Sequence, residues 1–211
     1  MKETVEFDRQ TRTTQKYYNL IALIYRWIQP FTRRAAVQAF RQELWSRLPP
    51  GQTLEVGVGT GKNMVYYPEA VRVTAIDLSE RMLIKAREQA EELGINVDLR
   101  LMDVQSMSFQ DNTFDSAVSI FVFCTVPSPV KGLKEIGRVV KPGGDIWLME
   151  HVRIDKPVIG TLMDLANPFM VLMMRDHINR RTVENVKRAG LQIVSVENLR
   201  GNVLKRIHAK A

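Results

Sequence analysis

The sequence predicts an α/β domain with a mostly parallel sheet, helices on both faces and an antiparallel last strand. From residue 53 onward, strand-like apolar runs alternate with helical patterns, which is typical of parallel strands joined by crossover helices. The first run passes into glycines at positions 57, 59 and 61. Only residues 197–202 separate the last two runs, so these runs predict a hairpin and a reversed final strand.

The individual elements follow from local patterns. Ser79 is a suitable N-cap for a helix that ends at Gly94, and a second helix from about Pro129 to Val140 stops before the breakers Pro142, Gly143 and Gly144. The predicted strands are Thr53–Val56, Val71–Ile76, Val97–Met102, Ser116–Phe121, Asp145–Glu150, Leu191–Val196 and Val203–Ala209.

Two segments lie outside the alternation. Residues 12–48 predict helix, because apolar side chains recur there at three- and four-residue steps. We therefore expect an N-terminal helical lid over residues 1–48, which also has the composition of a membrane-contacting segment. Residues 49–211 form the main domain, with an insertion at about 152–178 that holds the apolar run from Pro168 to Met174.

The bulk composition narrows the class of protein. The 211 residues fit one domain, and 45% are apolar, enough for a packed core. Cys124 is the single cysteine, so no internal disulfide forms and no zinc pattern exists. The charged N-terminus predicts a cytoplasmic protein, and the apolar run from Pro168 is shorter than the roughly 20 residues that span a bilayer.

The net charge of +7 is unevenly distributed. Residues 1–50 carry +5, residues 51–150 carry −4 and residues 151–211 carry +6. Basic flanks favour anionic partners such as an anionic lipid surface or nucleic acid. The alternative is a solvated surface that only aids solubility.

Acidic residues lie near the ends of the first three predicted strands. Glu55 precedes the first glycine, where it supports either a cationic ligand or nearby backbone N–H groups. Asp77 either accepts both hydroxyls of a ribose or caps the following helix. Asp103 is placed to accept an adenine amine while Val104 packs on the ring. The three positions predict a pocket for a nucleotide-like molecule at one edge of the sheet.

The glycine spacing is G-x-G-x-G. Dinucleotide folds use G-x-G-x-x-G to place a pyrophosphate on a helix N-terminus, and here Lys62 stands where that third glycine falls. Glycines without a Cβ allow close approach of a ligand to the backbone.

Together with Asp115 and the Lys-Pro-Gly-Gly run at 141–144, these motifs resemble class I S-adenosylmethionine-dependent methyltransferases over roughly residues 50–151. The resemblance implies their Rossmann-like, doubly wound seven-stranded sheet, and S-adenosyl-L-methionine as cofactor, with S-adenosyl-L-homocysteine as product. The cofactor-binding residues that it implies are Tyr18, Glu55, Gly57, Gly59, Gly61, Asp77, Leu78, Met82, Asp103, Val104 and Phe121.

The segment from Tyr18 to Phe31 is similar to the opening of ubiquinone/menaquinone-type and bacterial phospholipid N-methyltransferases, with Asn19 and Arg26 where those enzymes have aspartates. The segments around Cys124 and His151 also look like membrane-associated thiol methyltransferases. All these relatives imply a lipophilic acceptor, and the amine of phosphatidylethanolamine is the expected one. A small thiol, a quinone or phenol ring, and RNA are the alternatives.

Methyl transfer needs alignment and water exclusion more than acid–base chemistry. If the acceptor is an amine, it must bind neutral or lose a proton before attack. The candidate assistants are Tyr25, His151 and His177, and for Tyr25 and His151 an ordinary structural role is the alternative. We further expect a monomer without a metal ion, in contact with an anionic membrane surface and not with nucleic acid.

Overall fold

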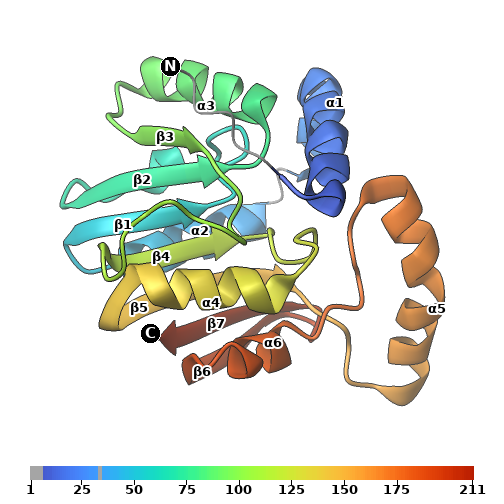
Figure 1. Cartoon of the computed structure of the whole chain (residues 1–211). Coiled ribbons are helices and arrows are strands. Elements are labelled where there is room, and N and C mark those ends of the chain that lie inside the picture. Colours follow the sequence, from blue (N-terminus) through green and yellow to red (C-terminus); the bar gives the residue numbers. More distant parts are fainter. Residues whose placement is uncertain (1–6, 33–34) are drawn as a thin grey trace.

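The computed structural model describes residues 7–32 and 35–211, with side chains at 7–22 and 36–211. Seven strands form one sheet in the order β3-β2-β1-β4-β5-β7-β6 (Figure 1). The strands are β1 (Gly51–Val56), β2 (Val71–Asp77), β3 (Asp98–Leu101), β4 (Phe114–Ile120), β5 (Val140–His151), β6 (Gln192–Arg200) and β7 (Leu204–Lys210).

The first five strands are parallel, and the predicted reversal at the end of the chain is confirmed. β7 pairs antiparallel with both β5 and β6, because only residues 201–203 join β6 to β7 and so short a link forces a hairpin. β5 begins earlier than predicted, at Val140. Its register against β4 shifts between the Phe114 and Ser116 pairs, so the Pro-Gly-Gly run forms an irregularity inside the strand.

Helices cover both faces of the sheet. On one face α4 (Pro129–Val139) and α6 (Thr182–Arg188) pack into a core with β1 and β4. On the other face α2 (Ala35–Ser46) and α3 (Glu80–Leu93) pack with β2 and β4. As predicted, Ser79 caps α3 by accepting from the Met82 N–H at 3.2 Å, and Gly94 ends it in the left-handed conformation.

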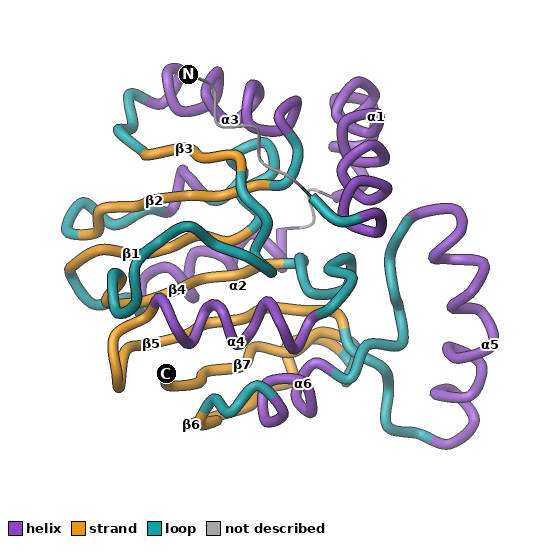
Figure 2. The backbone as a smooth tube through the Cα atoms, in the orientation of Figure 1, coloured by secondary structure: helices purple, strands orange, loops and turns teal. Residues whose placement is uncertain are grey.

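The segment predicted as one helical lid contains two helices with different roles. α1 (Arg9–Thr32) lies across the carboxyl ends of the strands (Figure 2). Its Gln15 amide donates to the Leu78 carbonyl at 3.0 Å, and Asn19 accepts from the Ser79 hydroxyl at 2.6 Å. In α2, by contrast, Leu44 and Trp45 are fully buried, so this helix belongs to the core of the sheet domain.

The insertion contains one long helix, α5 (Pro157–Met174), which stands beyond the carboxyl ends of the strands in Figure 1. The sequence pattern places the start of the apolar run at Pro168, but this proline lies inside the helix. The apolar segment is therefore 18 residues long. It is the one helix in the described part of the chain with a length and composition compatible with crossing a membrane.

Candidate active site

A cavity of about 730 Å³ opens at the carboxyl ends of the strands, beneath α1. A pocket of this size is typical for a small-molecule or cofactor site. The predicted site residues in its lining are Tyr18, Gly57, Gly59, Asp77, Leu78, Met82, Asp103, Val104, Phe121 and His151. The cavity is thus lined by α1, by the ends of β1, β2 and β5, and by the segments after β3 and β4.

The glycine loop after β1 forms one wall. Gly57, Gly59 and Gly61 have φ of 72°, 56° and 80°, a region that side chains disfavour. A Cβ on Gly57 would lie 2.3 Å from the Val122 side chain, whereas a Cβ on Gly59 would meet nothing within 4 Å. Gly57 therefore allows close packing of the loop, and Gly59 presents bare backbone to the cavity.

Asp77, the last residue of β2, fixes the loop and the start of α3. Its carboxylate accepts from the Gly59 N–H and from the Ser79 N–H, each at 2.8 Å. Burial raises the pKa of this carboxyl, and the backbone hydrogen bonds oppose that shift. The cap of α3 is Ser79 itself, so Asp77 is a positioning acceptor at the pocket wall.

Asp103 and Val104 form the wall after β3. The Asp103 carboxylate accepts from the Gln105 N–H at 2.9 Å and from the Thr11 hydroxyl at 3.1 Å. Gln105 also donates to Thr11 at 3.0 Å and accepts from the Ser128 N–H at 2.8 Å. This network ties the start of α1 to the pocket, which the sequence did not indicate.

Glu55, a predicted cofactor-binding residue, is not among the residues that line the cavity, although its partner Asn63 is. Glu55 is 1% exposed, and its two carboxylate oxygens accept from the Asn63 amide and the Tyr67 hydroxyl. Burial raises its pKa. The sequence predicted that Glu55 would support either a cationic ligand or backbone N–H groups. Its partners in the structure are instead the side-chain donors of Asn63 and Tyr67. Gly61 likewise lies behind the loop, where a Cβ would meet the Met64 sulfur at 2.9 Å.

The opposite side of the cavity carries a different set of groups. The Phe121 and His151 rings pack at 4.8 Å between centroids, and Tyr18 of α1 and Asp176 after α5 also line the space. Burial raises the pKa of Tyr18 and lowers that of His151, so the imidazole is neutral at pH 7 and able to accept a proton.

Of the other two predicted assistants, His177 is absent from the cavity lining. The His177 backbone N–H donates to the Cys124 carbonyl at 2.9 Å, and its ring lies 3.5 Å from the Asn167 amide of α5, outside the lining. The Tyr25 side chain lies outside the described residues. The neighbour of His177, Asp176, is a cavity residue that sequence reasoning missed.

One oxygen of the Asp176 carboxylate, Oδ1, is buried without a hydrogen-bond partner among the described residues; the same holds for Glu150 Oε2 and the Thr60 hydroxyl, but Asp176 is the carboxylate of this set that lines the cavity. The Cys124 thiol hydrogen-bonds to the Asp176 side chain, and burial with nearby carboxylates raises the pKa of that thiol. Buried polar atoms are nearly always paired in native proteins. An unpaired carboxylate oxygen in a pocket lining therefore indicates that a bound ligand donates a hydrogen bond to it.

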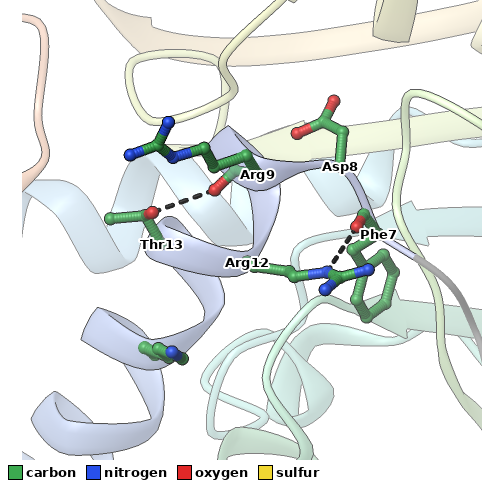
Figure 3. A pocket seen from close by; sticks show the side chains of 6 residues that line it. Phe7, Asp8, Arg9, Arg12 and Thr13 are labelled. Atoms are coloured by element: carbon green, nitrogen blue, oxygen red, sulfur yellow. Dashed lines mark hydrogen bonds between the residues drawn. The ribbon is translucent and has the colours of Figure 1, made fainter.

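Figure 3 shows a second hollow, at the start of α1, where Arg12 donates to the Phe7 carbonyl at 2.6 Å. Phe7, Asp8, Arg9, Arg12, Thr13 and Lys16 line it. It is more open than the main cavity and is lined by other residues of the helix than Thr14 and Tyr18, which line the main cavity. We assign it no ligand.

The free energy of unfolding should depend on pH because of Glu150, which lies near the end of β5. Glu150 accepts from the Val122 N–H at 2.9 Å, and burial raises its pKa from 4.5 to about 8. The folded state thus holds a proton between these values that the unfolded state releases, so stability falls as pH rises through this window, by up to about 1.4 kcal/mol per pH unit. Glu150→Gln removes this dependence.

Urea unfolding at several pH values between about 5 and 8 measures the effect. The exposed Glu92 of α3 offers a matched control, since Glu92→Gln should leave the wild-type profile unchanged. Parallel profiles for wild type and Glu150→Gln would show that Glu150 is already ionised in the folded state at pH 5.

The comparisons with known proteins agree with the fold and the cavity. Residues 54–148 match the family model described as a methyltransferase domain. The chain thus carries a class I S-adenosylmethionine-dependent methyltransferase domain. Its fold is shared with geranyl diphosphate C-methyltransferase from Streptomyces coelicolor A3(2), solved with S-adenosyl-L-homocysteine, at a TM-score of 0.75 and 14% identity over 98% of this chain and 99% of that one.

Two curated relatives are similar in sequence. A phosphatidylethanolamine N-methyltransferase from Cereibacter sphaeroides is 43% identical over 108 residues, 50% of this chain and 53% of that protein. A thiol S-methyltransferase from Mus musculus is 30% identical over 149 residues, 68% of this chain and 61% of that protein. The chain therefore spans about half to three-fifths of the length of these relatives.

The cavity fits the methyl donor of this class, S-adenosyl-L-methionine. The bare backbone at Gly59 leaves room for a ligand beside the loop, and the carboxylates of Asp77 and Asp103 line the same wall as the apolar side chains of Met82 and Val104. These acceptors and apolar side chains suit a molecule that combines hydroxyl groups with an aromatic base.

Proposed function

We propose that the protein transfers methyl groups from S-adenosyl-L-methionine to the amine of a lipophilic acceptor, with phosphatidylethanolamine and its methylated products as the expected substrates. The observation that carries this proposal is the unpaired Asp176 carboxylate oxygen, which lies in the cavity with Tyr18, Phe121 and His151. The cofactor carries the methyl group on a sulfonium sulfur, and a neutral amine nitrogen of the acceptor takes this methyl group.

The glycine-loop side holds the cofactor in this proposal. The Asp77 carboxylate accepts the ribose hydroxyls, the backbone at Gly57 and Gly59 lies along the methionine part, and Asp103 with Val104 meets the adenine. Leu78 and Met82 supply apolar contacts from the same wall. Each role uses a group that already lines the cavity.

The Asp176 side of the cavity suits a cationic head group. A carboxylate attracts an ammonium ion, and the aromatic ring of Tyr18 in the same lining adds cation–π attraction. The nearby Arg180 donates to the Val126 carbonyl at 2.7 Å, and the Asp176 Oδ1 atom is left without a partner among the described residues. A quinone ring has no donor for that oxygen and a thiol has only a weak S–H donor, whereas an ammonium ion offers a charged donor.

His151 completes the proposal by accepting the proton that a primary ammonium must lose before attack. Its pKa is lowered by burial, so the neutral imidazole is the main form at pH 7. Asp176 raises that pKa in part and so stabilises the imidazolium once the proton has moved. The amine nitrogen then gains a methyl group and becomes a substituted ammonium held by Asp176.

The test is transfer of labelled methyl from the cofactor to phosphatidylethanolamine in mixed micelles. We expect Asp176→Asn to lower kcat/KM at least tenfold, because it removes the charge that holds the ammonium, while cofactor affinity measured by calorimetry stays unchanged. The exposed Asp98 of β3 offers a control, since Asp98→Asn should keep wild-type activity. Wild-type rates for Asp176→Asn would overturn the role of this residue.

A thiol acceptor is the second candidate, favoured by the similarity to the mouse thiol S-methyltransferase. A panel of small thiols and phenols beside the lipid amine separates the two. Transfer to a thiol that does not depend on Asp176, with none to the amine, would assign the protein to that class.

A further inference from the structure

Helix α5 exposes an apolar surface without a partner among the described residues. Its large apolar side chains with more than half of their surface exposed are Val158, Leu162, Leu165, Phe169, Leu172 and Met173. Gly160 is the only residue of this helix that is buried. Contiguous exposed apolar surface of this kind marks an interaction site.

Two polar side chains of α5, those of Asp164 and Asn167, contact the rest of the protein, which fixes the apolar side outward. Asp164 accepts from Arg153 at 2.9 Å and from Asn179 at 3.0 Å. Asn167 lies against His177, and the Tyr17 hydroxyl of α1 donates to the Met173 carbonyl at 3.3 Å. Turning the apolar side inward would break these contacts, so the outward orientation is built into the fold.

The ends of the helix show how it meets its partner. Both ends return to the sheet domain: the chain enters from β5, and Asp176, two residues after the helix, lines the cavity (Figure 2). A helix of 18 residues is about 27 Å long. If it spanned a membrane, its ends would lie on opposite sides, which the attachment of both ends to one domain forbids. The helix must lie parallel to any bilayer that it contacts.

The charges around α5 indicate what kind of partner its apolar side contacts. The only charged residue within the helix is Asp164, and it is paired. Lys156 precedes the helix and Arg175 follows it, beside the acids Asp155 and Asp176 respectively, and residues 151–211 as a whole carry a net charge of +6. An apolar helix with cations at both ends matches the boundary between acyl chains and anionic head groups.

We propose that α5 docks the protein on an anionic lipid bilayer, lying flat with its apolar side among the acyl chains and Lys156 and Arg175 at the head groups. Met174, the last residue of the helix, lines the cavity together with Asp176. Docking therefore places the cavity mouth at the level of the head groups. The docking itself does not depend on the amine chemistry proposed above, and it is measured without cofactor or acceptor.

The test is flotation of the full chain with vesicles of phosphatidylcholine plus phosphatidylglycerol, and with phosphatidylcholine alone. We expect the wild type to float with the anionic vesicles and the double variant L165E/F169E to lose at least fivefold of the bound fraction. The control is V194E/V196E, which places the same two charges at exposed apolar positions of β6. Thermal melts establish that both variants fold.

Equal flotation of L165E/F169E and wild type, or no flotation of the wild type, would overturn the proposal. A wild-type dimer in light scattering that L165E/F169E dissociates would instead assign this surface to a second copy of the chain. A short-chain, dispersed amine separates docking from catalysis, because L165E/F169E should methylate it at the wild-type rate. Loss of flotation with normal methylation of the dispersed amine supports docking, and absence of methylation in the wild type refutes only the proposed function.

Discussion

Asp77→Ala should weaken cofactor binding at least 100-fold, which corresponds to about 2.7 kcal/mol. The carboxylate is the acceptor proposed for the ribose hydroxyls, and it also holds the Gly59 and Ser79 N–H groups at 2.8 Å. Its removal takes away a charge-assisted contact and releases the loop that approaches the ligand. Titration calorimetry with S-adenosyl-L-homocysteine measures the loss directly.

The control for Asp77 is a variant that keeps the shape of the side chain. Asp77→Asn retains one acceptor oxygen and should fall between wild type and Asp77→Ala. Unchanged affinity in Asp77→Ala would contradict the ribose role and leave Asp77 as an acceptor for backbone groups alone.

Gly57→Ala should destabilise the fold by about 3 kcal/mol or more. The residue has φ of 72°, where an alanine costs about 1–2 kcal/mol, and its Cβ would lie 2.3 Å from the Val122 side chain, so packing must also shift. Urea unfolding gives the difference, and the displaced loop should also reduce cofactor binding.

Gly94→Ala separates backbone strain from the clash. Gly94 has φ of 65°, and a Cβ added to this residue would meet nothing within 4 Å, so its alanine variant should lose about 1 kcal/mol and bind cofactor normally. Equal losses for the two variants would show that the contact with Val122 is relieved without cost.

Local chemistry made much of the fold predictable. Alternating apolar runs, the Ser79 cap, the Gly94 stop and the short hairpin link each depend on a few neighbouring residues, and the structure confirms all four. The cofactor side was equally accessible, because strand ends in a parallel sheet converge on one edge whatever lies elsewhere. Asp77 and Asp103 therefore line one cavity.

The acceptor side depends on contacts between distant segments and was harder to predict. In the sequence, Asp176 and His177 are neighbours, and no local pattern shows which of them lines the cavity. The path of the chain after α5 places Asp176 in the cavity lining and His177 beside Asn167. The buried position of Glu55 requires Asn63 and Tyr67, which reach it by the turn after the glycine loop. No pattern of neighbouring residues in the sequence indicates either the position of Asp176 or the burial of Glu55.

The hydrogen bonds of α1 have a kinetic consequence. Thr11 holds Asp103, and Gln15 and Asn19 hold the backbone and cap beside Asp77, so the helix is fastened to two walls of the cavity it covers. Breaking these bonds together would widen the exit for a ligand beneath the helix. We therefore expect the residence time of the spent cofactor, and with it the turnover rate, to be set by how often α1 detaches.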